Sequence, residues 1–350
     1  MKSISDVARL AGLSVASVSR VLNGSKPVTP ETRDRVMRAA TELHYSIDRR
    51  ARALRRQKSG TIGLIVADAE NPFFAQIIRS IEGVTYDSKH DLFLCNSDED
   101  PEREQFHLQA MRAQRIDGII LLPVCATGAS LAPFLQSETP IVCLDRRLPD
   151  VDLDLAIVDN VLGSALAVDH LVAQGHRRIA IITAHDETVS FERVAGFRAA
   201  LARFDIAERR EYERRGHDAR LQTGLELTSA LLGLGEPPTA IFVTNHLMLL
   251  GAMRAARMAG ARVPQDLSLM GFDDTPWAEL LEPPLTTIGQ PTQALGTTAA
   301  NLLLDRVDRE YLGPSRQIVL PPSLIVRGSV GAAAARDPSP PDVLARNLSS

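Results

Sequence analysis

The stretch GLSVASVSRVLNG, residues 12–24, carries the first side chains whose types and spacing could support chemistry. A short helix between its turn residues would place Val18, Val21 and Leu22 on one side. The opposite side would carry small or hydrogen-bonding groups, namely Val15, Ala16, Ser19, Arg20 and Asn23. Small apolar groups contact the thymine methyl and arginine binds guanine, so this face predicts contact with base edges in a DNA major groove. The alternative is a helical bundle that contacts a protein through the same face.

A second set of candidate residues follows apolar runs in the rest of the chain. Four such places stand out: Asp68 to Phe74, Asp145-Arg146, Asn245-His246 and Asp273-Asp274. Ligands of open α/β sheets bind outside the carboxyl ends of the strands, so we expect these side chains to converge. Carboxylates and amides bind hydroxyls, and an aromatic face packs on a sugar ring. The pattern predicts a cleft for a polyhydroxylated ligand. For any single residue, the alternative is a cap on the next helix.

Three short helices would position the first set. Ser3, Ser14 and Thr29 stand where N-caps are expected, and Pro30 would begin the third helix. Two short helices joined by a turn that contains Gly12 form the pattern of a helix-turn-helix. We expect a shared core beneath them, made of Val7, Leu10, Val18, Val21, Leu22, Val36, Ala40 and Leu43.

The next segment, YSIDRRARALRRQKSG at residues 45–60, is crowded with arginine and has few apolar residues. Such a segment is disordered alone in water, and it can become helical once DNA phosphates neutralise it. We expect Arg52 to contact DNA. Leu54 is the one large apolar residue among these arginines, which predicts a wedge inserted into a minor-groove base step. The alternative is a simple basic linker.

Charge is distributed unevenly along the 350 residues. Residues 1–60 hold 13 Lys and Arg against 5 Asp and Glu, whereas the whole chain has a net charge of −4. A basic head on an acidic body predicts that the head binds a polyanion. No run reaches the roughly 18 apolar residues of a membrane span, and the polar N-terminus lacks the apolar segment of a signal peptide. We therefore expect a cytoplasmic protein with no membrane partner.

Short apolar runs alternate with helical patterns after Gly60. Seven runs predict buried strands: TIGLIVAD, DLFLCNSD, GIILLPV, PIVCLD, RRIAIIT, TAIFVT and LSLMGFD. Amphipathic segments such as FFAQIIRSIEGVTYDSKH and NHLMLLGAMRAARMAG lie between them. This alternation predicts an α/β fold with doubly wound parallel sheets. The pattern leaves open whether there is one sheet or two.

Together these motifs resemble the LacI/GalR family of bacterial transcriptional regulators. ISDVARLAGLSVASVSRVLNG and TELHYSIDRRARAL resemble the family's DNA-binding head and hinge. The likeness continues to about residue 330 through IGLIVAD, NPFF, HLVAQGHRRIAIIT, ERVAGF, GFDD, PPLTTIGQP and LIVRGS. The resemblance implies that the outward face of the second helix reads an operator. It also implies that Leu54 pairs with the same residue of a second copy to open the central base step.

The resemblance further implies an effector bound between two subdomains. Matching residue by residue places seven side chains at effector positions: Phe73, Phe74, Asp145, Arg193, Asn245, Asp273 and Gln290. His246 adjoins them where the family commonly has Asp, which predicts altered effector chemistry or pH sensitivity. A core or surface histidine is the alternative. The stretch ETVSFER does not match the family's nucleobase-binding branch, so we predict a sugar or sugar derivative as the effector.

The implied architecture is a helix-turn-helix head at residues 1–45 and a hinge helix with linker at 46–60, followed by a periplasmic-binding-protein-like core at 61–330. The resemblance implies chain crossings near residues 160, 289 and 323. One subdomain would then comprise 61–159 with 290–322, and the other 160–289 with 323–330. Residues 331–350 are rich in Ala, Pro and Ser and contain no leucine heptad, which predicts a disordered tail. The resemblance implies a dimer, because family members that tetramerise do so through a C-terminal helix of that kind. Two hinge positions depart from the family: Ile47, where many members have proline, and Arg50, where an apolar residue is common.

We therefore predict an effector-responsive, sequence-specific DNA-binding regulator, a repressor of carbohydrate-utilisation genes that a sugar or sugar derivative releases. Its predicted partners are a pseudo-palindromic double-stranded operator, that effector and a second copy of the chain. Two other classes compete: a solute-binding protein that feeds a transporter, and an enzyme on an α/β fold. The basic head argues against the first. The sequence contains no phosphate-binding loop, GxSxG or HExxH motif, which argues against an enzyme. Because no cysteine pair has CxxC spacing either, we expect no catalytic residue, metal or cofactor.

Overall fold

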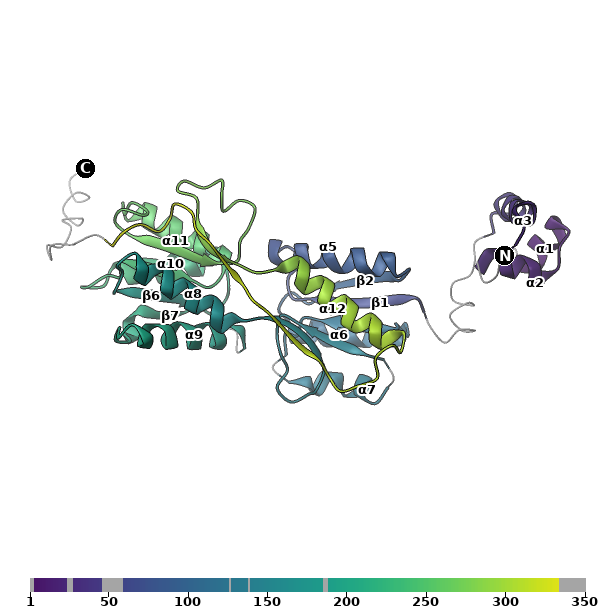
Figure 1. Cartoon of the computed structure of the whole chain (residues 1–350), viewed down its shortest axis with the longest axis horizontal. Helices are drawn as coiled ribbons and strands as arrows, with labels where there is room; N and C mark the ends of the chain where they lie inside the picture. Colours follow the sequence, from purple (N-terminus) through teal and green to yellow (C-terminus); the bar gives the residue numbers. More distant parts are fainter. Residues whose placement is uncertain are drawn as a thin grey trace. The chain divides into compact units, whose positions relative to one another are not determined.

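The computed structural model describes residues 3–23, 28–45, 59–125, 127–137, 139–184 and 188–333. The chain divides into two compact units, residues 1–60 and residues 61–350 (Figure 1). The described part of the smaller unit contains three helices: α1 (Ile4–Ala11), α2 (Val15–Asn23) and α3 (Pro30–Glu42).

Local sequence sets the ends of these helices. The Ser3 side chain accepts a hydrogen bond from the Asp6 backbone N–H, and the Asp6 carboxylate accepts one from the Ser3 N–H at 2.9 Å, which forms a capping box. Gly12 ends α1 at a φ of 62°, a conformation that glycine adopts without steric cost. Thr29 caps α3, whose first residue is Pro30. The predicted helices and their caps are confirmed.

The core of the smaller unit lies between the three helices. Its buried members are Val7, Ala8, Ala11, Val18, Val21, Val36, Ala39 and Ala40, with Leu22 and Leu43 packed against them. Leu10 is 46% exposed, so its predicted place in this core is wrong. The inward face of α1 is built from Val7, Ala8 and Ala11 instead, because two small alanines let α1 pack closely on α3.

The larger unit contains two six-stranded sheets in its described residues, which answers the question that the sequence left open. The first sheet has strand order β11-β5-β4-β3-β1-β2, and all its neighbouring strands are parallel. The second has order β12-β10-β9-β8-β6-β7 and is parallel except for the antiparallel pair of β10 and β12. The predicted α/β fold with doubly wound parallel sheets is confirmed.

Each sheet draws strands from distant parts of the chain. The first sheet comprises β1 (Thr61–Val66), β2 (Asp91–Asn96), β3 (Gly118–Leu121), β4 (Ile141–Leu144), β5 (Asp154–Val158) and β11 (Gln317–Leu320). The second comprises β6 (Ile179–Thr183), β7 (Glu213–Arg215), β8 (Ala240–Val243), β9 (Ser268–Phe272), β10 (Thr286–Gly289) and β12 (Ser323–Ile325). All seven predicted strands are present. The predicted burial of β2 is wrong, because β2 is an edge strand and Leu94 is 42% exposed.

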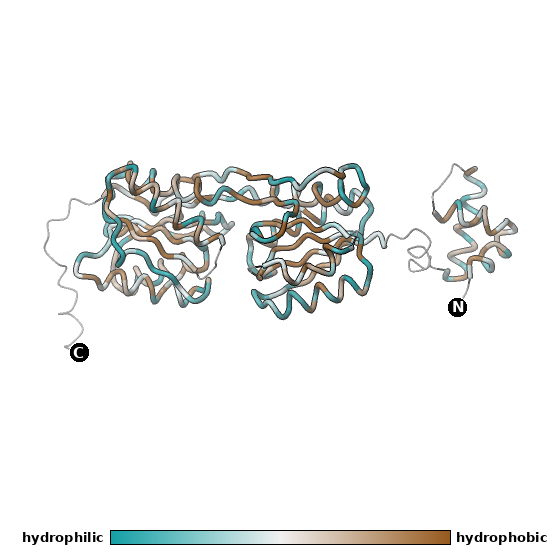
Figure 2. Tube along the Cα trace, turned by 90° about the horizontal axis from the view of Figure 1, so that it is seen from below, coloured by the Kyte–Doolittle hydropathy of each residue, from teal (hydrophilic) through white to brown (hydrophobic). Residues whose placement is uncertain are grey.

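Helices cover both faces of each sheet, and the apolar strands lie between them (Figures 1 and 2). We call the first sheet with its helices the first lobe: α5 (Pro72–Asp87) and α12 (Thr292–Val307) on one face, and α6 (Pro101–Ala113), η1 (Gly128–Leu131) and α7 (Ala132–Leu135) on the other. The second lobe is the second sheet with α8 (Asn160–Ala173), α9 (Val189–Arg203), η2 (Arg210–Tyr212), α10 (Leu221–Leu232) and α11 (His246–Met258). Among the described residues, no helix is long and apolar enough to span a membrane.

The chain passes between the lobes at three described places: from β5 to α8, from β10 to α12, and from β11 to β12. At the third passage only Pro321 and Pro322 separate the two strands, so one short segment adds an edge strand to each sheet.

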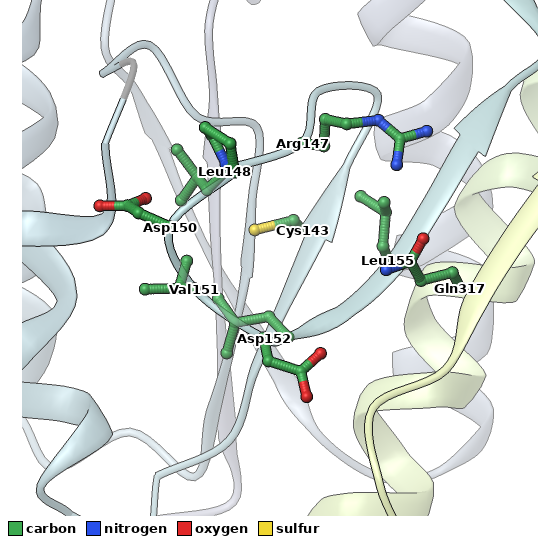
Figure 3. Close-up of a pocket in the computed structure, with 10 residues that line it drawn as sticks. Cys143, Arg147, Leu148, Asp150, Val151, Asp152, Leu155 and Gln317 are labelled. Atoms are coloured by element: carbon green, nitrogen blue, oxygen red, sulfur yellow. The ribbon is translucent and has the colours of Figure 1, made fainter.

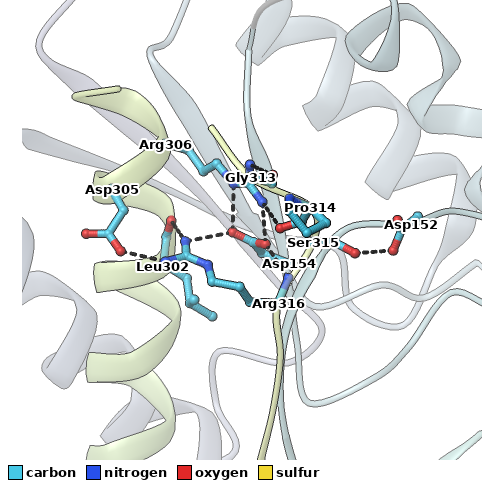
Figure 4. Close-up of polar contacts among 9 residues, drawn as sticks. All are labelled: Asp152, Asp154, Leu302, Asp305, Arg306, Gly313, Pro314, Ser315 and Arg316. Atoms are coloured by element: carbon cyan, nitrogen blue, oxygen red, sulfur yellow. Dashed lines mark hydrogen bonds and ion pairs between the residues drawn. The ribbon is translucent and has the colours of Figure 1, made fainter. Parts of the chain in front are cut away.

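A buried carboxylate joins three parts of the first lobe (Figure 4). Asp154, the first residue of β5, is 3% exposed. Its carboxylate accepts two hydrogen bonds from Arg306 of α12, at 2.8 and 3.0 Å, and one from the Arg316 guanidinium at 2.9 Å. Burial raises the pKa of Asp154, but the hydrogen bonds from the two arginines outweigh burial and hold the pKa below its ordinary 3.8.

His176 anchors the segment that follows β12. It is 2% exposed, and its Nε2 lies 3.0 Å from the Gly331 carbonyl oxygen. Burial lowers the pKa of His176 below its ordinary 6.5, and this outweighs the opposing effect of the Gly331 hydrogen bond. The unfolded chain therefore binds a proton more readily than the folded one, so folding stability falls as the pH drops through about 6.5.

We expect the thermal unfolding midpoint to fall by about 2–4 °C between pH 7.5 and 5.5, which corresponds to roughly 1 kcal/mol for a unit of this size. The His176→Gln variant is less stable at pH 7.5 and has a smaller pH dependence over the same range. Differential scanning calorimetry at the two pH values measures both. An equal fall in the two proteins would contradict the role of His176.

Candidate functional site

The outward face of α2 has the exposure that the sequence predicts. Val15 is 44% exposed, Ala16 and Arg20 are exposed, and Ser19 is half-buried. The Ser14 Oγ accepts a hydrogen bond from the Ser17 backbone N–H at 3.1 Å, which is the geometry of an N-cap. The surface of α2 therefore combines small side chains with one arginine. The side chain of Asn23 lies outside the described part of the structure, as do Ile47, Arg50, Arg52 and Leu54.

A buried polar network lies at the carboxyl ends of the second sheet. Asp273 directly follows β9 and is 7% exposed. One carboxylate oxygen accepts a hydrogen bond from Gln290 Nε2 at 2.6 Å, and the other lies 3.3 Å from His246 Nδ1. Two atoms of this network, His246 Nε2 and Gln290 Oε1, are buried without a hydrogen-bond partner among the described residues. Unsatisfied buried polar atoms are rare in native proteins, so they mark this network as a place where a ligand could bind.

Arg193 of α9 joins the same network. Its Nη1 donates to the Thr244 carbonyl oxygen at 2.6 Å and its Nε donates to Asn160 Oδ1 at 2.9 Å. The guanidinium carbon lies 3.6 Å from the centroid of the Phe272 ring, a cation–π arrangement. Arg193 is thus a buried, planar cation held in a fixed orientation beside a carboxylate.

The charge of Asp273 is stabilised despite its burial. Burial raises the pKa of this carboxyl, but the His246 hydrogen bond, the Arg193 charge and the Gln290 hydrogen bond together hold the pKa below its ordinary 3.8.

Asp273 also has a φ of 77°, in the left-handed region, and Asp145 after β4 has a φ of 67°. Asp145 follows β4 and Asp273 follows β9, and each of these strands is the third in the strand order of its sheet, counted from β11 and from β12. Left-handed backbone at non-glycine residues is often found at binding sites.

The other predicted effector residues have different surroundings. Phe73 and Phe74 lie in the apolar core of the first lobe, with ring centroids 5.0 Å apart. The Asn245 side chain accepts hydrogen bonds from the Leu247 and Met248 N–H groups and so caps α11, which is the alternative considered for each strand-end residue. The structure therefore brings His246, Asp273 and Gln290 together by direct interactions, and the charge of the nearby Arg193 acts on Asp273. The two phenylalanines instead contribute to the apolar core of the first lobe.

Two of the cavities among the described residues of the larger unit bear on the candidate site. One has a volume of about 420 Å³ and follows the connection between β4 and β5, with Arg147, Asp150, Asp152 and Gln317 in its lining (Figure 3). The other has a volume of about 290 Å³ and is lined by residues that include Gln76 of the first lobe and Gln290. Gln290 is therefore shared between the second cavity and the buried polar network.

Three residues around Arg193 were not predicted from the sequence. Asn160 accepts from Arg193, Glu192 accepts from Asn160 Nδ2 at 2.8 Å, and Arg147 donates from Nε to Glu192 at 3.2 Å. Asn160 begins α8 just after β5, so the run DLAIVDN carries the same signal as the other strand ends. Arg147 directly follows Asp145-Arg146 and so adjoins a strand end already singled out, whereas Glu192 has no comparable signal because its role depends on residues far away in the chain.

Comparison with known proteins agrees with this architecture. Residues 3–48 match the bacterial regulatory proteins of the lacI family, and residues 168–330 match a periplasmic binding protein-like domain. The HTH-type transcriptional repressor PurR of Actinobacillus pleuropneumoniae is 36% identical over 94% of this chain and 98% of its own length. The ribose operon repressor of Haemophilus influenzae is 34% identical over 94% and 99%. A Lac repressor dimer solved with operator and the anti-inducer ONPF has a TM-score of 0.82 at 30% identity, covering 95% of this chain and 99% of that one.

A helix-turn-helix unit followed by two lobes of the periplasmic binding protein-like fold defines a class of transcriptional regulators rather than a class of enzymes. Within that class, the chain belongs to the lacI family of bacterial regulatory proteins.

Proposed function

We propose that the protein is a homodimeric, cytoplasmic repressor that binds a pseudo-palindromic operator and releases it when a sugar or sugar derivative binds. The observation that carries the proposal is the outward face of α2, where exposed Val15 and Ala16 accompany Arg20. Exposed small side chains are suited to close approach to base edges, and arginine to guanine. We further propose the domain division inferred from the sequence, with the head at residues 1–45, the hinge at 46–60 and the core at 61–330.

A dimer suits this function because two related heads present two recognition helices to a symmetric site. The likeness to the operator-bound Lac repressor dimer supports this arrangement. Because of this likeness to an operator-bound dimer, we assign the arrangement of the two lobes in this structure to the operator-binding state. We also propose that Ser14, Ser19, Asn23, Arg52 and Leu54 contribute to DNA contact.

The proposed effector site comprises Arg193, His246, Asp273 and Gln290, with Phe73, Phe74, Asp145 and Asn245 at its margins. A buried carboxylate, a planar cation and two polar atoms without a partner in the described part of the chain suit a ligand with several hydroxyl groups. A purine base is the second candidate, because a relative is the repressor PurR. The sugar is favoured because ETVSFER before Arg193 does not match the nucleobase-binding pattern.

One experiment tests both parts of the proposal. Duplexes that bind the full-length protein are selected from a random DNA pool, and the selected complex is then titrated with D-ribose, cellobiose, guanine and hypoxanthine. We expect an approximately palindromic consensus and release by a sugar. Failure to enrich any sequence would contradict the operator-binding proposal. Release by a purine alone would replace the sugar with a purine base.

Arg20→Ala is expected to weaken binding to the selected duplex by about 1–3 kcal/mol and to relax the preference at one base pair in each half-site. The reason is that arginine discriminates guanine by paired hydrogen bonds that alanine cannot make. Fluorescence anisotropy with the consensus duplex and its single-base variants measures both effects. Arg9→Ala on α1 is the matched control, because Arg9 is an exposed arginine that pairs with Asp6 of its own helix. Unchanged binding by Arg20→Ala would contradict the proposed recognition face.

A further inference from the structure

An ion pair connects the two lobes close to the proposed effector site. Arg147 lies in the connection between β4 and β5 of the first lobe, and Glu192 lies in the first turn of α9 in the second. Arg147 Nε is 3.2 Å from Glu192 Oε1, and the side chains are 39% and 30% exposed. Because the two residues belong to different lobes, the distance between them depends on how the lobes are arranged.

The second oxygen of Glu192 faces the interior. Glu192 Oε2 accepts a hydrogen bond from Asn160 Nδ2 at 2.8 Å, and Asn160 Oδ1 accepts one from Arg193 Nε at 2.9 Å. Asn160 is 3% exposed and Arg193 is 7% exposed. A continuous series of hydrogen bonds therefore runs from the buried Arg193, through Asn160 and Glu192, to Arg147 of the first lobe.

The position of Asn160 makes this series sensitive to the lobe arrangement. Asn160 is the first residue of α8, where the chain has just passed from the first sheet to the second. Its amide is held from both sides, because its oxygen serves Arg193 and its nitrogen serves Glu192. A ligand that reorients the Arg193 guanidinium changes the hydrogen bond to Asn160, and through Asn160 it changes the position of the Glu192 carboxylate.

We propose that Glu192 is a positioning residue that couples ligand binding at Arg193 to the inter-lobe ion pair with Arg147, and that this pair favours the operator-binding arrangement of the lobes. The inference rests on the proposed function, which supplies the ligand at Arg193 and the assignment of this arrangement to the operator-binding state. Partly exposed ion pairs contribute little to folding stability. A free energy as small as that of one such ion pair nevertheless changes the ratio between two lobe arrangements severalfold when their free energies are nearly equal.

The test uses the full-length protein with Arg147→Gln, Glu192→Gln and the two substitutions combined. The glutamine introduced by Glu192→Gln retains an oxygen that can accept from Asn160, so this variant removes the charge while it keeps the hydrogen-bonding shape. The matched control is Glu213→Gln. Glu213 is the first residue of β7 and pairs at 2.7 Å with Arg198, which lies in α9 as Glu192 does. Both partners of this control pair belong to the second lobe.

Binding is measured by fluorescence anisotropy on the consensus duplex selected with the unsubstituted protein. We expect each single variant at Arg147 or Glu192 to bind that duplex about three- to tenfold more weakly. The combined variant is expected to bind no more weakly than the weaker single variant, because either change already removes the pair. Glu213→Gln should bind within about twofold of the unsubstituted protein, as expected for a partly exposed pair outside the inter-lobe contact. Thermal unfolding of all four variants, followed in parallel, should remain close to that of the unsubstituted chain.

The outcomes separate this inference from the proposed function. If the unsubstituted protein selects no DNA sequence, the proposed function fails and the coupling fails with it. If it selects a sequence but Arg147→Gln and Glu192→Gln bind normally or more tightly, the coupling is overturned and operator binding stands. Losses that multiply in the combined variant, or a loss at Glu192 alone with a lowered unfolding midpoint, would assign Glu192 a local structural role instead and also overturn the coupling.

Discussion

Asp154→Asn is expected to lower the free energy of unfolding of the larger unit by about 3–5 kcal/mol, the usual cost of removing one partner from a buried ion pair. Asparagine preserves the volume of the side chain but leaves the guanidinium groups of Arg306 and Arg316 without the carboxylate that both of them bind. Like charges then remain close together in a partly buried place. Urea unfolding followed by circular dichroism measures the loss.

The control for this substitution lies two residues earlier in the chain. Asp152 is exposed and interacts with the Ser315 side chain, so Asp152→Asn should change the unfolding free energy by less than about 0.5 kcal/mol. Because the pKa of Asp154 is held below 3.8, its contribution is present at neutral pH and is lost as the pH falls below about 4. Equal stability of the two variants would contradict the role given to Asp154.

Asp273→Asn is expected to weaken effector binding by about 10- to 100-fold while operator affinity in the absence of effector stays nearly unchanged, because hydrogen bonds to a charged group contribute about 1.5–3 kcal/mol. Asparagine tolerates the left-handed backbone at this position and can still bond to Gln290, so the substitution mainly removes charge. The measurement is a titration of the protein–operator complex with the ligand that releases it.

The matched control for Asp273→Asn is Asp266→Asn. Asp266 precedes β9 whereas Asp273 follows it, and Asp266 pairs with the exposed side chain of Arg262. The operator complex of this control variant should be released at the same ligand concentration as the complex of the unsubstituted protein. An unchanged titration of Asp273→Asn would contradict the proposed effector site, whatever the ligand proves to be.

Apolar strands and capped helices were predictable because each is specified by neighbouring residues. Central strands such as β1 and β8 are buried along nearly their whole length, and Ser3 and Thr29 bond to their own helices. Two of the strands missed from the sequence, unlike β5, have weak local signals. The strand β7 is the charged triplet ERR at a sheet edge, and β11 alternates between exposed and half-buried residues. Their pairing is decided by partners far away in the chain.

The candidate site shows the same limit. Asp273 and His246 were found because both follow apolar runs, and the structure brings them together. Glu192 lies in the first turn of α9 between Phe191 and Arg193, and only its distances to Asn160 and Arg147 identify it. The prediction that Leu10 is buried was wrong for a related reason, since α1 presents its small alanines to α3 and places the larger leucine at the surface.

The short connection between β11 and β12 has a consequence for biosynthesis. Both sheets stay incomplete until residues near 325 have been made, whereas the three helices of the first unit are complete by about residue 45. At about 5–20 residues per second, a ribosome needs roughly 15–60 s to add the chain between these points. During that interval the nascent protein carries a finished basic head but no finished core, so any control that the core exerts over the head begins only after residues near 325 have been made.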